Sequence, residues 1–235
     1  MSAHFTDIPA PRSDERTAAV HPDGESRTPY PDGKPRVPRP PAVVGREVAS
    51  PDTLGLWAFA VGTFLGNLPD TGLVGRTGLT ITVAVLLGGL AQLIAGVEAY
   101  RAGSVFGATS FTAFGLFWIT IGTTDWLTAL HVLAPVDHVA LGWYLALWTI
   151  FAGILFGATP ALNRALEITV GLSCAGLFAK AVGSFTDDIL LTRTGAWLLV
   201  ACAVAALYTT AAGFWNAAYR RTVLPLGVPA GRARS

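Results

Sequence analysis

Neutral polar side chains inside long apolar stretches are the residues of this chain whose types and spacing suit chemistry. Hydroxyl and amide groups at membrane depth replace the water around a small solute without the cost of a fixed charge. The alternative is that each group only forms hydrogen bonds between packed helices. Permeation of a small polar solute is therefore the chemistry expected of Asn67, Gln92, Thr109, Ser110 and Thr112, together with Thr63.

Asn67 has a second notable feature, the dipeptide Leu68-Pro69 that follows it. Proline lacks a backbone N–H and its ring disrupts a helix, so the first apolar stretch is expected to break here. A broken helix within a membrane is tolerated where its freed backbone groups line a cavity or are buried in protein. The sequence therefore predicts a cavity beside Asn67.

Two charged residues in the apolar stretches suggest a role in moving ions or protons. Lys180 is the most deeply placed charge, and an ionisable group inside a membrane is a functional hypothesis by default. It could instead extend to the membrane surface or pair with Asp125 or Asp187. Glu98 closes the second stretch, where contact with lipid headgroups competes with a proton relay as its role.

An enzymatic function is not supported by the motifs of the chain. No HExxH, P-loop or CxxC pattern is present, so no metal or cofactor is expected. His131 and His138 flank one loop rather than lying within the apolar stretches. Asp187 and Asp188 are adjacent but follow the fifth stretch, where water is expected to solvate them.

The distribution of charge indicates the elements that must position these residues. Residues 1–50 hold 14 of the 31 charged residues and 9 of the 15 prolines, a composition typical of a disordered tail. The other 185 residues share 17 charges, far fewer than the roughly 25% of a soluble domain. This low charge content excludes a water-soluble enzyme, a nucleic-acid binder and a secreted disulfide scaffold. We expect the apolar stretches to be surrounded by membrane lipid.

The fold class predicted from these stretches is an all-α integral membrane protein with six transmembrane helices. A bilayer core requires about 20 consecutive apolar residues for each helix. The chain divides into a Pro-rich cytoplasmic tail at 1–50, a transmembrane domain at 51–222 and a cytoplasmic C-terminal tail at 223–235. The six spans are expected near residues 53–74, 79–100, 107–133, 139–159, 165–185 and 195–219.

Basic residues near the span ends predict which side each end faces. Cytoplasmic loops carry an excess of Lys and Arg, and an even number of spans places both termini on one side. With cytoplasmic termini, five of these residues lie inside and only Arg76 and Arg193 lie outside. The five are Arg46, Arg101, Arg164, Arg220 and Arg221.

Three segments resemble the acetate uptake transporter family. GGLAQLIAG at 88–96 and FGATSFTAFGLFW at 106–118 are similar to the family's GGxAQ…AG stretch and FGATAFTSYGxFW block. RTVLPLG at 221–227 is similar to its RTVLPxG ending. SPDTLGL at 50–56 is similar to its NPAPLGL entry, and retains Pro51, Leu54, Gly55 and Leu56. The resemblance extends from about Pro51 to Gly227.

The resemblance implies a homohexamer of six-helix protomers, each with its own pore for acetate and in some members succinate. Passage in the family is described as proton-coupled uptake or as channel-like movement of the anion. Three apolar or aromatic side chains narrow the pore. Phe59 and Phe114 match two of them, with Phe114 replacing a common tyrosine, and the third falls near Leu172 and Ser173.

The function expected from the sequence is therefore a hydrophobically gated pore for acetate or another small carboxylate, with protons as a second substrate. Other readings remain open at this point. The chain could be an exporter or sensor linked to ammonia or organic acids, as distant fungal relatives of the family are, or a membrane scaffold that transports nothing.

Overall fold

The computed structural model describes residues 51–227. The predicted tail at 1–50 and residues 228–235 of the predicted C-terminal tail lie outside this range. Every described helix belongs to one unit of the chain, Val48–Ser235.

The described residues form an all-helical, membrane-spanning bundle, as predicted. Five helical rods are long and apolar enough to cross a membrane. The sixth, α1, has 17 residues, or about 25 Å at 1.5 Å per residue. The elements are α1 Pro51–Asn67, η1 Pro69–Thr71, α2 Gly78–Val83, η2 Ala84–Ala91, α3 Gln92–Arg101, α4 Val105–Ala129, α5 His138–Ala158, η3 Thr159–Ala161, α6 Arg164–Thr186 and α7 Ile189–Tyr219.

The first helix ends earlier than its predicted span of 53–74. It stops at Asn67, and Pro69 opens the short 3₁₀ turn η1, which Gly72 terminates with φ of 85°. Glycine adopts this left-handed conformation without the steric cost that a side chain would add. The predicted break at Leu68-Pro69 is confirmed, and it leaves the charged loop 70–77 at the end of the bundle.

Side-chain caps fix where most of the other helices begin. Ser104, Asp137, Asn163 and Asp188 each accept a hydrogen bond from a backbone N–H in the first turn of α4, α5, α6 and α7. Thr77 caps α2 and exchanges reciprocal hydrogen bonds with residue 80. Such caps satisfy N–H groups that have no partner inside the helix. The cap at Asp188 also starts α7 six residues before the predicted span of 195–219.

The second rod contains a π-helical segment that permits close packing with α1. α2, η2 and α3 run as one rod from Gly78 to Arg101, and η2 is its π-helical middle. A Cβ atom added to Gly62 would collide with the backbone of Gly88, so these two glycines allow the backbones to meet. Gln92, directly after η2, is thereby held inside the bundle with its side chain fully buried.

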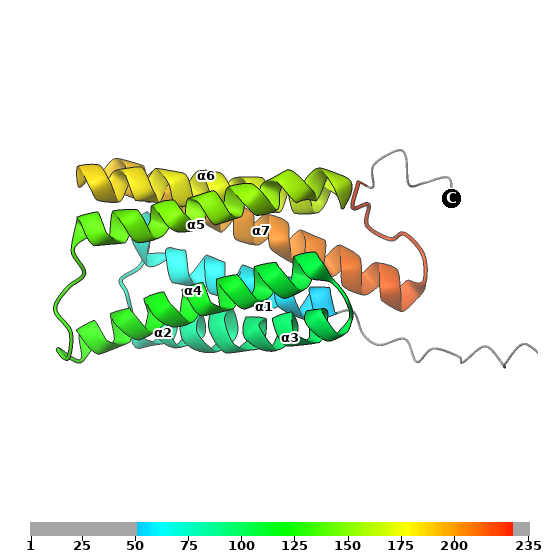
Figure 1. The fold of residues 1–235 in the computed structure, drawn as a ribbon, viewed down its shortest axis with the longest axis horizontal. Helices are drawn as coiled ribbons and strands as arrows, with labels where there is room; N and C mark the ends of the chain where they lie inside the picture. The colour runs from blue at the N-terminus through cyan, green and yellow to red at the C-terminus, as the bar shows by residue number, and fades with distance from the viewer. Residues whose placement is uncertain (1–50, 228–235) are drawn as a thin grey trace, which may run out of the picture. The chain divides into compact units, whose positions relative to one another are not determined.

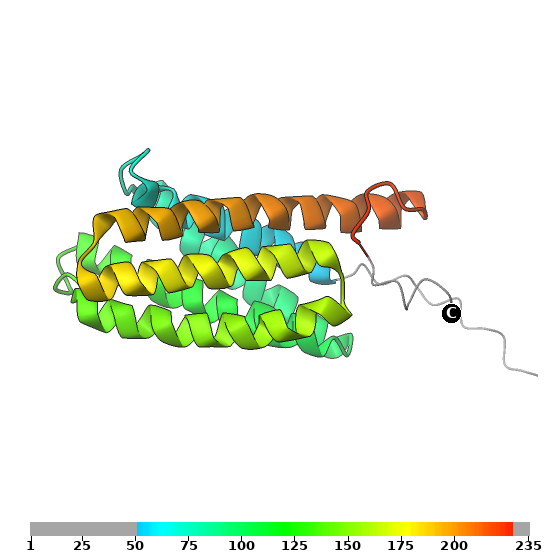
Figure 2. The ribbon, with the colours of Figure 1, turned by 90° about the horizontal axis from the view of Figure 1, so that it is seen from above.

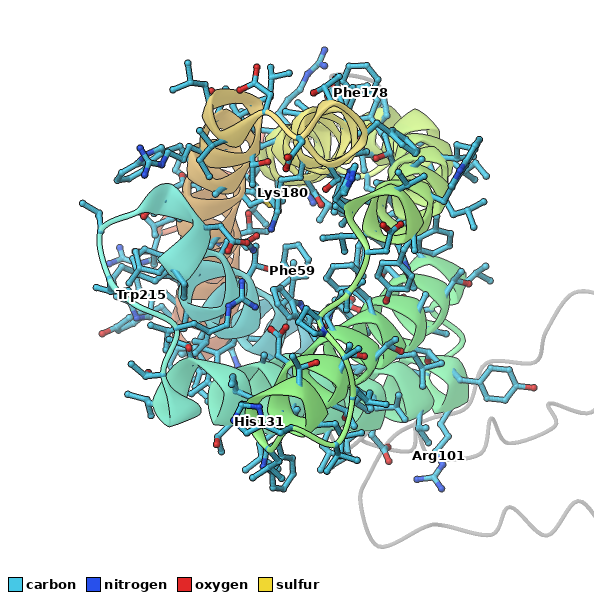
Figure 3. The ribbon with its side chains drawn as sticks, turned by 90° about the vertical axis from the view of Figure 1, so that its left-hand side faces the viewer. Phe59, Arg101, His131, Phe178, Lys180 and Trp215 are labelled. Atoms are coloured by element: carbon cyan, nitrogen blue, oxygen red, sulfur yellow. The ribbon has the colours of Figure 1, made fainter. Side chains whose placement is uncertain are left out.

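The helices surround a common interior. α6 packs against α5 and α7, while α1 packs against α7, η2 and α3, and α4 packs against η2 and α3 (Figures 1 and 2). The end-on view in Figure 3 shows Lys180 and Phe59 pointing into this ring of helices and Arg101 pointing away from it.

Aromatic side chains join α4 to α5 and complete the ring. Phe117 of α4 stacks on Tyr144 of α5 with ring centroids 5.7 Å apart. Phe114 contacts Trp148 and Phe151, both at 5.7 Å. Pairs at these separations stabilise packing by about 0.5–1.5 kcal/mol beyond the area that they bury.

The segment 223–227 folds back onto the bundle. Asn216 of α7 donates to the Leu224 carbonyl and accepts from the backbone N–H groups of Val223 and Leu224. The backbone N–H groups of Arg164 and Ala165, at the start of α6, donate to the carbonyls of Gly227 and Leu226. We call residues 223–227 the C-terminal strap. These bonds make it part of the helical domain, although the sequence assigned it to the C-terminal tail.

Asn216→Ala should loosen the strap and destabilise the protein. The substitution removes three hydrogen bonds to the strap, so we expect a loss of about 1–3 kcal/mol. The thermal unfolding temperature in detergent measures it. Asn216→Asp retains the oxygen acceptor and should lose less. Equal losses for both variants would show that the two accepted bonds contribute nothing.

Candidate functional site

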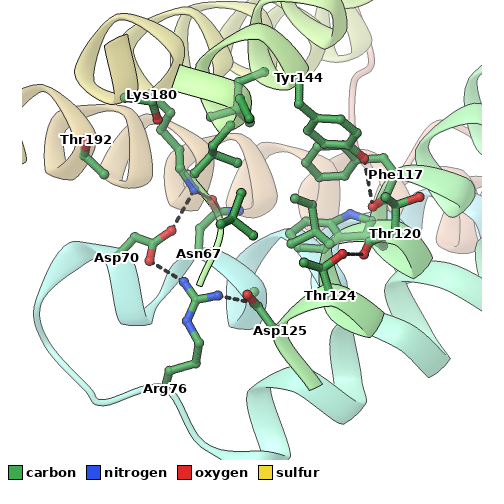
Figure 4. Close-up of a pocket in the computed structure, with 18 residues that line it drawn as sticks. Asn67, Asp70, Arg76, Phe117, Thr120, Thr124, Asp125, Tyr144, Lys180 and Thr192 are labelled. Atoms are coloured by element: carbon green, nitrogen blue, oxygen red, sulfur yellow. Dashed lines mark hydrogen bonds and ion pairs between the residues drawn. The ribbon is translucent and has the colours of Figure 1, made fainter. Parts of the chain in front are cut away.

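A cavity opens at the end of the bundle where α1 stops. It has a volume of about 360 Å³ and is lined by α1, the loop 70–77, α4, α5, α6 and α7. We call it the vestibule. Its polar lining includes Asn67, Asp70, Arg76, Thr120, Thr124, Asp125, Tyr144, Lys180, Ser184 and Thr192 (Figure 4).

Two smaller cavities continue from the vestibule into the bundle. The inner cavity, of about 20 Å³, shares Asn67 and Lys180 with the vestibule. The far cavity, of about 30 Å³, includes Gln92 and Ser110 in its lining. The inner and far cavities share Phe59 and Phe114. The three cavities therefore lie in series inside the bundle, and we call this series the pore track.

Phe59 and Phe114 form the constriction of this track. Their ring centroids are 5.4 Å apart, and both side chains are buried. Both residues line the inner cavity together with Asn67. Apolar narrowings of this kind gate pores because water leaves them easily.

Of Leu172 and Ser173, near which the third constriction residue was expected, only Ser173 lines the inner cavity. Leu172 packs partly buried against the hydrophobic core, and Ser173 and Leu177 of α6 line the inner cavity instead. Successive helical residues point about 100° apart, so a register error of one residue exchanges a lining position for a packing position. Because Ser173 is small and polar, Leu177 supplies the apolar surface of α6 in this cavity.

Several buried polar atoms along the track have no hydrogen-bond partner among the described residues. Gln92 is fully buried, and neither its amide nitrogen nor its amide oxygen is paired within residues 51–227. The Thr63 hydroxyl and the Trp118 indole N–H, in the lining of the inner cavity, are also unpaired within this range. Buried polar groups in native proteins nearly always have a partner, so these atoms point to a solute or water in the track.

Four charged groups form a continuous chain of ion pairs at the vestibule (Figure 4). Lys180 Nζ lies 2.7 Å from Asp70 Oδ2, and Arg76 Nη2 lies 2.6 Å from Asp70 Oδ1. The other Arg76 nitrogen pairs with Asp125. Lys180 also donates to Asn67 Oδ1 at 2.9 Å. The partner of Lys180 is thus Asp70, which the sequence did not suggest, rather than Asp125 or Asp187.

The electrostatics of the loop 70–77 keep Asp70 and Arg76 charged. Burial opposes ionisation of Asp70, but the charges of Lys180 and Arg76 outweigh it and lower the pKa of that carboxyl. Burial likewise opposes the charge on Arg76, but Asp70 and Asp125 raise the pKa of the guanidinium. The ion pairs of this loop are therefore present at neutral pH.

Asp70→Asn should reduce stability in a manner that depends on pH. Since the pKa of Asp70 is lowered, its stabilising contribution is complete above the unfolded value of about 3.9 and disappears as the pH falls through the folded value. The variant should unfold about 3 °C or more below the unsubstituted protein from pH 8 to pH 5. The gap should close only below about pH 4. A gap that already closes between pH 7 and pH 5 would contradict the lowered pKa.

The structure brings together most, but not all, of the residues expected to form the site. Asn67, Lys180, Phe59, Phe114, Gln92, Ser110 and Leu56 line the pore track. Thr112 lies against Gly96 between α3 and α4, and Thr109 is exposed. Glu98 is exposed and pairs with Arg101 at 2.6 Å, and none of these three residues lines the three cavities.

The entry motif shapes the start of α1 and only partly the track. Pro51 is the first residue of α1, and Leu54 is exposed. Gly55 leaves space for the ring of Phe111, which a Cβ atom would strike. Leu56 alone of these four residues lines the far cavity.

Sequence reasoning missed Asp70, Arg76, Trp118 and Leu177 as lining residues. Asp70 follows the predicted helix break directly, so its proximity to a cavity at Asn67 was open to inference. Trp118 had no comparable signal, because its unpaired indole nitrogen is apparent only from the packing.

A membrane-spanning bundle with a narrow track and an apolar constriction defines a membrane transport protein of the pore type. The family comparison agrees with this class. The chain matches the model of the GPR1/FUN34/yaaH family over residues 34–227, and it belongs to that family.

Relatives and a solved structure are similar along most of the chain. The succinate-acetate/proton symporter SatP of Escherichia coli K12 is 32% identical over 182 residues, covering 77% of this chain and 96% of that protein. The ammonia transport outward protein 2 of Saccharomyces cerevisiae is 31% identical over 172 residues, covering 70% of this chain and 61% of that protein. The solved structure of the bacterial acetate channel SatP superposes with a TM-score of 0.75 at 30% identity, covering 77% of this chain and 100% of that one.

Proposed function

We propose that this protein carries acetate, or a similarly small carboxylate, across the membrane through the pore track of each protomer. The observation that carries the proposal is that buried donors on both sides of the Phe59–Phe114 constriction have no partner within residues 51–227. The similarity to a succinate-acetate symporter and to an acetate channel supports the choice of solute.

The track suits a solute that is held weakly at several points. Once the side chains move apart to admit it, a carboxylate would meet the Thr63 hydroxyl and the Trp118 indole N–H in the inner cavity and the Gln92 amide in the far cavity. Several shallow sites favour conduction because a single deep site traps the solute. The two phenylalanine rings separate these sites and oppose leakage of water and ions.

A coupled proton would cross the constriction on the substrate itself. The described residues that line the far cavity include no titratable side chain, and Glu98 pairs with Arg101 outside the track. A proton relay past Phe59 and Phe114 therefore lacks a carrier among the described residues. Neutral acetic acid carries its own proton, which fits a proton-coupled uptake without a relay.

Labelled acetate uptake into liposomes containing the purified protein tests the proposed function. We expect saturable uptake that a protonophore diminishes if transport is proton-coupled and leaves unchanged if the pore conducts the anion. Uptake no faster than in protein-free liposomes would overturn the proposal. A membrane scaffold that transports nothing would also give uptake no faster than in protein-free liposomes.

The outward ammonia transport named for the yeast relative is the second candidate. Lys180 in the wall of the track repels an ammonium ion, which makes this candidate weaker for this chain. Methylamine efflux from the same liposomes separates the two candidates, because an ammonium transporter would carry methylamine and leave acetate outside.

We further propose a location in the plasma membrane, cytoplasmic termini and a homohexameric assembly. The start of α1 and the end of α7 lie at one end of the bundle, and Arg101 and Arg164 flank the helix ends there (Figure 1). In this orientation, the vestibule and Arg76 lie on the extracellular side of the membrane. A membrane-impermeant thiol reagent should label Arg193→Cys in intact cells and spare Arg101→Cys, and native mass spectrometry should count six subunits.

A further inference from the structure

We propose that Lys180 is the docking group for the substrate carboxylate in the vestibule, and that Asp70 is a resident carboxylate that the substrate displaces from it. This inference rests on the proposed function and identifies the substrate class as a monocarboxylate. Neither the family resemblance nor the names of the relatives assign a role to these two residues.

The first observation is the position of the Lys180 ammonium group. Lys180 lines both the vestibule and the inner cavity, so a solute passing between them moves alongside it. Its side chain is 14% exposed, which removes most of the water that would otherwise screen its charge. An ammonium carries three N–H donors, and those to Asn67 and Asp70 account for two of them.

The second observation is that Asp70 has another cation to hold it when Lys180 turns to the substrate. Its Oδ1 atom remains 2.6 Å from Arg76, which Asp125 holds in turn. When the substrate displaces Asp70, Lys180 pairs with the substrate carboxylate and Asp70 stays paired with Arg76. Both carboxylates therefore keep a cation. An unpaired buried charge would make the same step costly by several kcal/mol, as removal of a partner from a buried pair does.

The pKa of Asp70 supports this role. Because burial is outweighed by the charges of Lys180 and Arg76, the pKa of Asp70 lies below its usual value. The resident ligand of Lys180 is accordingly an ionised carboxylate at the pH at which acetate is also ionised.

The arrangement discriminates between substrates with one and with two carboxylates. Two Arg76 nitrogens already pair with Asp70 and Asp125, so Lys180 is the cation whose ligand can be exchanged. The second carboxylate of succinate would lie among Asp70 and Asp125, and like charges at short range repel each other. We therefore expect the vestibule to favour acetate over succinate, which is a narrower choice than the name of the bacterial symporter states.

Calorimetric titration of acetate and succinate into the purified full chain in detergent tests the docking role, alongside the liposome flux. Lys180→Met should weaken acetate binding by at least about tenfold, since a hydrogen bond to a charged group is lost. Lys180→Arg should retain most of the affinity. Asp70→Asn should bind acetate more tightly, because the resident competitor is gone, and should discriminate less against succinate. Arg101→Met is the matched control, because it removes a cation from an ion pair outside the pore track.

The double variant Lys180→Met with Asp70→Asn separates docking from a purely structural role. If Lys180 only neutralises Asp70, removal of both charges should restore acetate affinity, and this result would overturn the inference. If Lys180 docks the substrate, the double variant should bind as weakly as Lys180→Met. Binding that depends on Lys180 without any flux in liposomes would uphold the docking site and overturn the proposed transport. Acetate flux in liposomes together with unchanged acetate affinity in Lys180→Met would uphold the proposed transport and overturn the docking site.

Discussion

Gln92→Leu should slow acetate flux by at least about tenfold while making the protein more stable. Neither polar atom of the buried Gln92 amide has a partner within residues 51–227, and each unsatisfied group costs about 1–3 kcal/mol. Leucine removes that cost and fills a similar volume, so the unfolding temperature should rise. The same substitution removes the amide that would hold the carboxylate in the far cavity. Liposome flux and thermal unfolding in detergent measure the two effects on one preparation.

This prediction is specific because acetate flux should fall while thermal stability rises. A structural amide would lose stability and flux together when replaced, because its hydrogen bonds would be broken. Gln92→Glu provides the matched comparison, since it keeps the shape but places a negative charge in the track. It should block acetate more completely than Gln92→Leu. Unchanged flux in Gln92→Leu would remove the far cavity from the transport path.

Phe114→Ala should open the constriction and let larger monocarboxylates through. The Phe114 ring lies 5.4 Å from that of Phe59 and separates the inner cavity from the far cavity. Its loss should raise acetate flux about tenfold or more, since an apolar barrier to the anion is removed, and should admit butyrate. The substitution also removes contacts with Phe117, Trp148 and Phe151, so a loss of about 3–5 kcal/mol in stability accompanies it.

Two controls keep the effect on the gate apart from the effect on packing. Phe114→Leu preserves most of the packing and should raise flux less. Phe178→Ala removes a ring from α6 that is exposed and points away from the interior (Figure 3), and it should leave flux unchanged. If Phe114→Ala leaves selectivity unaltered while the protein remains folded, the constriction lies elsewhere.

The features that sequence predicted well are those set by local chemistry. The Leu68-Pro69 break depends on a missing N–H and needs no knowledge of neighbouring helices. The all-helical, membrane-spanning fold follows from stretch length and sparse charge. Asn67, Phe59 and Phe114 were each singled out in the sequence for a different reason, and they line one cavity.

The features that sequence missed depend on helix rotation and on distant partners. Thr109 and Ser110 are neighbours on α4, yet Ser110 lines the far cavity and Thr109 is exposed. A hydroxyl side chain carries no sign of which way it faces when both faces of the helix are apolar. Leu172 and Leu177 both lie on α6, yet only Leu177 lines the inner cavity, and the cause is again the rotation of the helix. Lys180 and Asp70 are 110 positions apart, and only the packing of α6 beside the end of α1 makes them partners.

The C-terminal strap has a consequence for how the protein is made. Chains emerge and fold from the N-terminus during synthesis, so α6 enters the membrane well before Leu226 and Gly227 exist. Among the described residues, the N–H groups of Arg164 and Ala165 donate to those two carbonyls, which are translated only after α7. Membrane insertion of α6 and completion of the hydrogen bonds at its start are therefore separate events, and the second requires the strap to have been synthesised.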